Sequence, residues 1–347
     1  QWLMHQFGMI GRLGANALVV LASFVWEVSA ADSPISRATL LGQLEQVMGS
    51  LPSNAKRGPL DVQVESTEDA GEFERRKLTY LSEPGSRVPA YLLVPKHALR
   101  PDVGRVFPAV LGLHQTHPAG AKVVIGLGQS PDDEYGVELV RRGFVVLAPP
   151  YPWLAGYEPD LAKLGYASGT MKAIWDNIRG LDLLTDLPFV STNRGFGCIG
   201  HSLGGHNGLF TAAFDSRITV IATSCGFDSF RDYYGGSPTV WQPEKGWCQQ
   251  RYMPRLAEYR GRLDAIPFDF SEVLALIAPR RTYVSAPRGD SNFRWDSVDR
   301  VVAEARVLAA ELGVSAKIVV EHPDSPHRFP SEQREEAYRI IGEVLRP

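Results

Sequence analysis

Cysteine is scarce in this chain. Among 347 residues only three cysteines occur, Cys198, Cys225 and Cys248. An odd count excludes a fully paired disulfide framework, although Cys225 and Cys248 could still form one bridge. Cys198 lies within an apolar run and is expected to be a small core residue. CxxC and HExxH motifs are also missing, so the common signatures of redox and zinc sites are absent and we predict no metal site.

Neither sign of charge dominates the composition. The chain has 36 Lys and Arg against 39 Asp and Glu, a formal net charge of -3, and no run rich in basic residues. It therefore lacks the electrostatic footprint of a nucleic-acid-binding protein, and we predict no nucleic-acid partner. Internal repeats and low-complexity tracts are missing too, so a length of 347 residues fits one large domain with insertions, or two smaller domains.

One apolar segment lies near the start of the sequence. Residues 15–26 are mostly apolar, Arg12 precedes them, and Val28-Ser29-Ala30 follows. This is the layout of a secretory signal peptide with a small-residue cleavage site, and the run is too short to cross a bilayer comfortably. We expect a signal peptide at 1–30, a domain at 31–347, and a secreted or periplasmic protein. A buried helix and an uncleaved membrane anchor remain open.

The rest of the chain alternates between two kinds of segment. Residues 73–95 predict a β-hairpin at a sheet edge, because two strand-like runs flank the turn signal Glu83-Pro84-Gly85. From residue 107 onward, short runs that are apolar on both faces alternate with helical stretches, which is typical of a parallel sheet covered on both sides. We predict an α/β fold with a mostly parallel central sheet of about eight strands. The expected strands are 60–66, 73–95 as two strands, 107–114, 144–150, 196–202, 218–224, 281–287 and 317–323. The expected helices are 36–50, 134–142, 170–185, 204–213, 297–312 and 332–345.

Two segments interrupt this alternation. Residues 151–169 form a loop rich in proline, glycine and aromatic residues, and residues 226–275 form a longer insertion with ten aromatic side chains. We interpret the insertion as a cap over the sheet within a single domain.

The stretch GCIGHSLGG, residues 197–205, places a serine between glycines directly after a predicted strand and before a predicted helix. A sharp strand-to-helix turn holds its central residue in a strained conformation, so its neighbours two positions away must be small. Here they are Gly200 and Gly204. This is the G-x-S-x-G nucleophile elbow, which lifts the hydroxyl of Ser202 above the sheet edge. A plain glycine-rich turn or a phosphate-binding loop is the alternative.

A serine hydroxyl needs a base, and the base needs a group that orients it. In this fold the chain order is serine, then acid, then histidine. Asp290 follows the predicted strand 281–287, with Asp296 as its rival in the same loop. His327 lies in a proline-bounded loop after the last predicted strand, with His322 as its rival. A zinc site formed by these two histidines and a nearby aspartate is the weaker alternative.

A tetrahedral oxyanion requires two backbone N–H donors. One is the residue after the nucleophile, Leu203, and the other lies in the loop after an earlier strand. That loop is LHQTHPAG, from which we favour Thr116 and then Gln115. The histidines of these two segments are expected to pack or hydrogen bond rather than react: His114, His117, His201 and His206.

With these residues in view, the chain resembles the α/β-hydrolase superfamily, most closely its dienelactone-hydrolase-like and acetyl-xylan-esterase-like serine hydrolases. The resemblance runs from about Arg76 to the C-terminus through RVPAYLLVP, LGLHQT, GFVVLAPPYP, GCIGHSLGGHNGLF, RGDSNF and HPDSPHRFP. It departs from the dienelactone hydrolases proper, which use cysteine where this chain has Ser202. It also has Gln115 where many relatives carry glycine, so the oxyanion loop is expected to be narrower.

The expected function is therefore hydrolysis of a carboxylic ester through a Ser-His-Asp triad and an acyl-enzyme, without a cofactor. The insertion and Trp153 are expected to line the substrate site. A small-molecule or sugar ester is the expected substrate, sugar esters being implied by the resemblance alone. A prolyl-oligopeptidase-like peptidase and a non-catalytic relative are the alternatives, although 31–106 is too short for the extra N-terminal domain that such peptidases usually carry.

Overall fold

Nine strands form one sheet in the order β1-β2-β3-β5-β4-β6-β7-β8-β9. The structure is a computed structural model that describes residues 35–102 and 104–346. The strands are β1 (Gln63–Asp69), β2 (Phe73–Glu83), β3 (Ser86–Pro95), β4 (Ala109–Leu113), β5 (Val145–Ala148), β6 (Phe196–His201), β7 (Ile218–Ser224), β8 (Arg281–Ser285) and β9 (Lys317–Glu321). The expected signal peptide at 1–30 lies outside the described residues.

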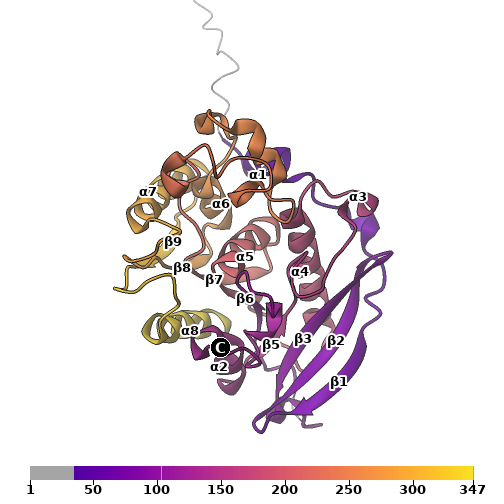
Figure 1. Cartoon of the computed structure of the whole chain (residues 1–347). Helices are drawn as coiled ribbons and strands as arrows, with labels where there is room; N and C mark the ends of the chain where they lie inside the picture. The colour runs from indigo at the N-terminus through magenta and orange to yellow at the C-terminus, as the bar shows by residue number, and fades with distance from the viewer. Residues whose placement is uncertain (1–34, 103, 347) are drawn as a thin grey trace, which may run out of the picture. The chain divides into compact units, whose positions relative to one another are not determined.

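The sheet has an antiparallel edge and a parallel centre. Strands β1, β2 and β3 pair antiparallel, and β3 also pairs antiparallel with β5. The pairs from β5 through β4, β6, β7 and β8 to β9 are all parallel. The predicted mostly parallel α/β sheet is confirmed. The first strand begins three residues later than the expected 60–66 and is exposed throughout, because it is the outermost strand and no helix covers it (Figure 1).

Helices bury both faces of this sheet. They are α1 (Arg37–Met48), α2 (Tyr135–Arg141), α3 (Leu161–Leu164), α4 (Gly169–Asp186), α5 (Leu203–Phe214), α6 (Phe270–Ile277), α7 (Trp295–Glu311) and α8 (Ser331–Leu345). Successive strand residues point to opposite faces: Leu111 of β4 packs in the core beneath α4 and α5, while Val110 packs in the core with α2 and α8. Helices α2 and α8 lie together on one side of the sheet (Figure 1). Among the described residues, no helix combines the length and apolar character that a membrane span needs.

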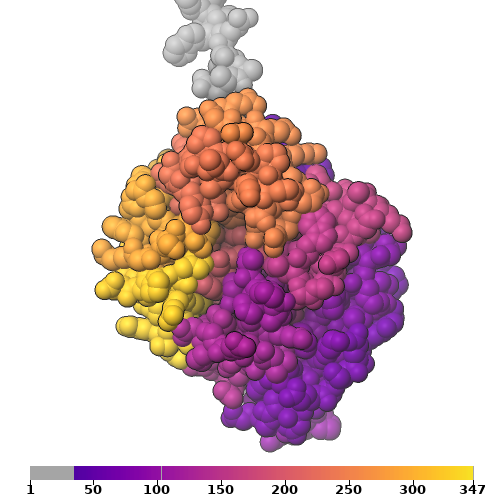
Figure 2. Space-filling model, in the orientation of Figure 1, coloured from indigo at the N-terminus to yellow at the C-terminus, as the bar shows by residue number. Residues whose placement is uncertain are grey.

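The segment between β7 and α6 has its own way of folding. It contains no strand and no α-helix, only the short 3-10 turns η5 (Tyr233–Gly236), η6 (Gly246–Cys248), η7 (Pro254–Tyr259) and η8 (Leu263–Ala265). Its order comes from aromatic packing, since Phe230, Trp241 and Trp247 are nearly inaccessible and Phe230 contacts both tryptophans edge to face. Figure 2 shows this segment (orange) as a continuous patch of the surface. The last residues of the expected 226–275 insertion, 270–275, lie in α6, which packs against α5 and α7.

Asp269 holds the two ends of this insertion together. Its carboxylate accepts hydrogen bonds from the Ser229 hydroxyl (2.6 Å) and the Phe230 backbone N–H (3.2 Å) near the start of the segment. The same side chain caps α6 at the end of the segment, in a reciprocal capping box with Glu272. The insertion is therefore a closed loop anchored at its base. The three cysteines are all buried and unpaired, so Cys225 and Cys248 form no bridge.

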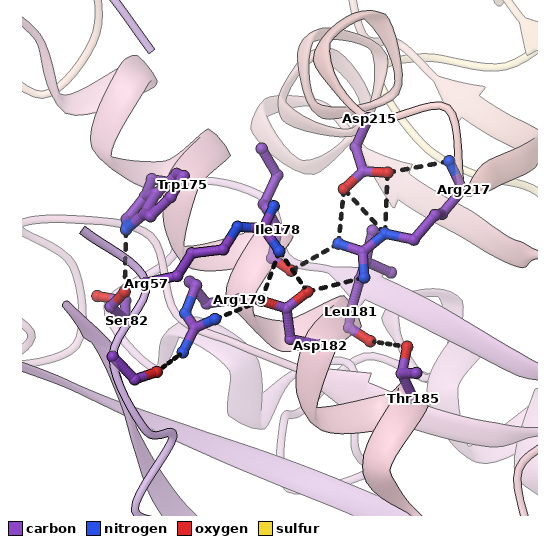
Figure 3. A network of polar contacts seen from close by, with 11 residues as sticks. Arg57, Ser82, Trp175, Ile178, Arg179, Leu181, Asp182, Thr185, Asp215 and Arg217 are labelled. Atoms are coloured by element: carbon purple, nitrogen blue, oxygen red, sulfur yellow. Dashed lines mark hydrogen bonds and ion pairs between the residues drawn. The ribbon is translucent and has the colours of Figure 1, made fainter. Parts of the chain in front are cut away.

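A single carboxylate joins three separate parts of the chain around α4. Asp182 accepts hydrogen bonds from Arg57 of the N-terminal segment (2.9 Å), from Arg217 of the turn before β7 (2.7 Å), and from Arg179 on its own helix (Figure 3). Arg217 also pairs with Asp215. Three guanidinium groups this close repel one another, and the negative charge of the Asp182 carboxylate between them offsets that repulsion.

Replacement of Asp182 by alanine is expected to lower the free energy of unfolding by about 2 kcal/mol, because hydrogen bonds to charged groups are lost and the guanidinium groups lose their counter-charge. The measurement is urea unfolding followed by circular dichroism. Asp186→Ala, one turn later on the exposed face of α4, is the matched control. Equal midpoints for the two variants would show that the network adds nothing.

Asp228 is a buried carboxyl at the start of the insertion. It is 2% exposed, and its Oδ2 accepts one hydrogen bond, from the backbone N–H of Arg294 (3.2 Å). Burial raises the pKa of Asp228 to about 8, and the nearby acids Asp232, Asp269 and Asp290 add to this rise. Because the pKa lies above that of an unfolded chain, the folded state binds more protons than the unfolded state between about pH 4 and pH 8. Stability at this site is therefore lost as the pH rises through that window.

Asp228→Asn is expected to remove this loss, since an amide keeps the carbonyl acceptor and carries no charge. The free energy of unfolding of the variant, relative to that of the wild type, should rise by more than about 1 kcal/mol when the pH is raised from 5 to 8. Unfolding curves at both pH values measure the gain, with Asp264→Asn at an exposed position (91% exposed) as the control. A difference between wild type and Asp228→Asn that stays constant with pH would contradict the titration.

Candidate active site

Ser202 occupies the sharp turn between β6 and α5. Its backbone has φ 52° and ψ −119°, a combination that residues other than glycine rarely adopt. Its N–H donates to the carbonyl of Ser224 at the end of β7 (2.8 Å). The strained conformation, held by the neighbouring strand, is the one expected of a nucleophile elbow.

The two glycines around Ser202 are required by close contacts. A β-carbon at Gly200 would lie 2.2 Å from the carbonyl carbon of Gly204, and one at Gly204 would lie 2.0 Å from the carbonyl oxygen of Leu113. Atoms cannot approach this closely. The absence of a side chain at Gly204 therefore lets the first turn of α5 contact the end of β4, which brings the loop after β4 beside Ser202.

The structure brings the three predicted side chains together in one line of hydrogen bonds. His327 Nε2 lies 2.9 Å from Ser202 Oγ, and His327 Nδ1 lies 2.9 Å from Asp290 Oδ1. Asp290 lies in the loop after β8 and His327 in the loop after β9, so all three residues lie at the carboxyl edge of the parallel strands, where α/β folds bind ligands. The geometry fits an imidazole whose Nδ1 proton is donated to Asp290 while Nε2 accepts from the serine hydroxyl.

Asp290 is held as a carboxylate in a buried position. Its side chain is 2% exposed, and Oδ1 also accepts from the backbone N–H of Asn292 (2.7 Å) and of Phe293 (3.2 Å). Burial by itself raises the pKa of this carboxyl, but the hydrogen bond and charge of His327 and the Asn292 N–H outweigh it, so that the pKa is lowered. The ionised form is therefore the one that this site stabilises.

The rival residues lie elsewhere. Asp296 is in the first turn of α7, where it pairs with Arg294 and Arg300. His322 bonds to the carbonyl of Ala286 (2.8 Å) and to Asp299 (3.0 Å). Neither reaches Ser202.

Cys225 comes close to the acid and the base. One ligand atom each from Cys225, Asp290 and His327 lies within 4.8 Å of the other two. Burial raises the pKa of the Cys225 thiol well above its usual value, which disfavours the thiolate that metals bind. Both ring nitrogens of His327 are already hydrogen bonded, so the imidazole offers no free lone pair. The arrangement fits a hydrogen-bond relay better than a metal site.

The predicted oxyanion donors flank Ser202. Leu203 is the first residue of α5, and the first N–H groups of a helix have no partner within it. Thr116 lines the same cavity as Ser202 and Leu203, and its hydroxyl contacts that of Tyr252 (3.1 Å). Gln115 is half-buried, and its carbonyl accepts from His114 Nδ1 (2.7 Å). The roles of Leu203, Thr116 and Gln115 in an oxyanion site remain predictions.

A cavity of about 140 Å³ opens beside Ser202. Half of its lining residues come from the insertion, among them Tyr233, Trp247 and Tyr252, and Phe293 comes from the acid loop. The expectation that Trp153 lines the site is wrong. Trp153 packs against the main core, because the loop 151–169 is turned into the domain by buried tyrosines such as Tyr157, which donates to Asp176 (2.7 Å).

The buried histidines near the site are neutral. Burial lowers the pKa of His114 to about 4 and of His201 and His206 to about 3. His114 has a structural task, since its Nε2 accepts the Tyr151 backbone N–H (3.0 Å). His206 lines the cavity and packs on Trp247, with ring centroids 4.5 Å apart. His206 and Asn292 were not expected at the cavity from the sequence. His206 lies one helical turn after Ser202, and that spacing is a signal that could have found it.

A putative hydrolase is among the known proteins that this chain resembles in sequence. No protein-family profile matches the chain. A protein of Bacillus subtilis (strain 168) named "Putative hydrolase YtaP" is 27% identical over 321 residues, which cover 89% of this chain and 100% of that protein.

Two esterases are among the solved structures of similar architecture. A glucuronoyl esterase from Solibacter usitatus superposes with a TM-score of 0.66 at 19% identity, covering 88% of this chain and 91% of that one. Acetyl xylan esterase 1 from Thermoanaerobacterium sp. JW/SL YS485 superposes with a TM-score of 0.57 at 17% identity, covering 90% and 94%. Such likenesses establish architecture, and with the sheet order and the turn at Ser202 they show that this chain has the α/β-hydrolase fold.

Proposed function

We propose that the protein is a serine hydrolase of carboxylic esters. The observation that carries the proposal is the line of two 2.9 Å hydrogen bonds from Ser202 through His327 to Asp290, which ends at a cavity. A buried carboxylate, an imidazole and a hydroxyl in this order activate the hydroxyl as a nucleophile. The solved structures of similar fold are named as esterases, which supports ester rather than peptide chemistry.

The first half of the reaction forms an acyl-enzyme. Ser202 Oγ attacks the ester carbonyl while His327 Nε2 takes the hydroxyl proton. The Asp290 carboxylate holds Nδ1–H and stabilises the imidazolium that forms. The negative charge on the carbonyl oxygen would be received by the backbone N–H groups of Leu203 and of Thr116 or Gln115. The imidazolium then gives its proton to the departing alcohol, and the acyl group stays on Ser202.

The second half releases the acid. Water takes the place of the alcohol and attacks the acyl carbonyl while His327 Nε2 takes one of its protons. The bond from the acyl carbon to Ser202 Oγ then breaks, His327 returns the proton to Oγ, and the carboxylic acid leaves. No electron transfer is involved, so the residues named suffice for every proton moved.

A sugar ester is the proposed substrate. The structures named above act, by their names, on glucuronoyl and acetyl xylan esters. A secreted or periplasmic location is proposed with it, because residues 12–30 have the layout of a signal peptide.

Ser202→Ala is expected to lower kcat for p-nitrophenyl acetate by at least about 10⁴-fold, because no other hydroxyl occupies the elbow. A fluorophosphonate probe should label the wild type at Ser202 and leave the variant unlabelled. Aminoacyl anilides should be cleaved more slowly than the ester. Ser237→Ala, in the insertion, is the control for substitution of a serine as such. Retained activity in Ser202→Ala would refute the mechanism, and faster anilide cleavage would favour a peptidase.

Asp290→Asn is expected to lower kcat by about 10⁴-fold, because an amide cannot stabilise the imidazolium and favours the wrong imidazole tautomer. Asp296→Asn, at the rival acid, should stay within about threefold of the wild type. The two variants are compared under identical conditions on the same ester. Larger losses in Asp296→Asn than in Asp290→Asn would reverse the assignment of the acid.

A further inference from the structure

One hydrogen bond joins the insertion to the loop that carries the acid. The hydroxyl of Tyr234 donates to Asn292 Oδ1 (3.2 Å), and both residues line the cavity beside Ser202. Tyr234 lies in η5 of the insertion, and Asn292 lies between β8 and α7. The contact therefore bridges two segments that meet over the nucleophile.

Asn292 is fixed firmly on its side of this bridge. Its backbone N–H donates to Asp290 Oδ1 (2.7 Å), so the side chain that meets Tyr234 projects from a residue already anchored to the triad. Next to it, Phe293 is buried and packs near Tyr233, with ring centroids 5.9 Å apart. The acid loop thus provides a rigid half of the cavity wall.

Tyr234 is held in an unusual conformation on the other side. Its backbone has φ 47° and ψ 39°, and Gly235 and Gly236 continue in the left-handed region with φ 65° and 70°. A bulky residue adopts such angles only where the surroundings demand it. The residue is 50% exposed and also lines the cavity, so it has the cavity on one side and solvent on the other.

In the proposed reaction the acyl group occupies this cavity. Ser202 and the predicted oxyanion donors Leu203 and Thr116 line it, so an ester carbonyl held at Ser202 Oγ faces it. The departing alcohol takes its proton from His327 and therefore lies toward that ring. A volume of about 140 Å³ is well below the roughly 300–1,000 Å³ of sites that bury drug-sized ligands.

We propose that the Tyr234–Asn292 contact is the outer wall of the acyl site and restricts the enzyme to esters of short acyl groups. This inference rests on the proposed ester hydrolysis and adds to it the residue that sets acyl length. A long acyl chain has no exit past the tyrosine ring, so its ester cannot place the carbonyl at Ser202. Removal of the ring widens the cavity toward solvent on this side and gives the chain a path outward.

The test uses p-nitrophenyl acetate, butanoate and octanoate with the full-length wild type and three variants. The wild type is expected to have at least about tenfold lower kcat/KM for octanoate than for acetate. Tyr234→Ala should raise the octanoate-to-acetate ratio about tenfold, and Tyr234→Phe, which keeps the ring and loses the hydroxyl, should raise it less. Tyr259→Ala is the matched control, because Tyr259 belongs to the same insertion but does not line the cavity.

The outcomes separate this inference from the function beneath it. Equal kcat/KM of the wild type for octanoate and acetate would contradict the proposal that Tyr234 limits acyl length. An unchanged octanoate-to-acetate ratio in Tyr234→Ala, with acetate still hydrolysed, would contradict it as well. An increase of the same size in Tyr259→Ala would also overturn it, because the effect would then belong to the insertion as a whole. Failure of the wild type to hydrolyse any of the esters, together with no fluorophosphonate labelling, instead removes the proposed function and this inference with it.

Discussion

The contact between Gly204 and the carbonyl of Leu113 is the constraint on which the candidate site depends. It lets the first turn of α5 approach the end of β4 more closely than any side chain permits. Two things follow from the same contact. Ser202 is kept at the edge of the sheet in a backbone conformation that would relax if the helix moved away, and the loop with Thr116 is brought to the same cavity. The nucleophile and its predicted oxyanion donor are positioned together rather than separately.

The residues that could be predicted from the sequence are those whose environment is local. The turn at Ser202 needs glycines at defined offsets, and Asp290 and His327 each follow a recognisable buried strand, so chain order alone placed them in one site. The apolar run at 270–277, preceded by Asp269 and with Glu272 three residues later, carried a capping-box signal, yet the density of aromatic residues before it led to its inclusion in the insertion.

The cavity wall could not be predicted in the same way. Tyr234 and Asn292 are 58 residues apart, and they meet only because the insertion folds back on itself without strands or α-helices to indicate its path. Trp153 shows the converse case. Its position in an aromatic loop after β5 suggested a place at the substrate site, but hydrogen bonds from neighbouring tyrosines to buried carboxylates, such as Tyr166 to Glu83 (2.7 Å), draw that loop into the domain. Hydrogen bonds between side chains of distant segments decide the path of such loops, and the hydrophobic periodicity of the sequence does not predict these bonds.

The clamp at Asp269 has a consequence for how this protein can change. Because both ends of the insertion meet at one carboxylate and the following helix starts there, the exposed parts of the loop can change without any shift in the strands on either side. The sequence of such a loop can change during evolution while Ser202, Asp290 and His327 keep their positions. Divergence among relatives of this architecture is therefore expected to concentrate between residues 230 and 268, and exchange of that segment between them offers a route to new selectivity.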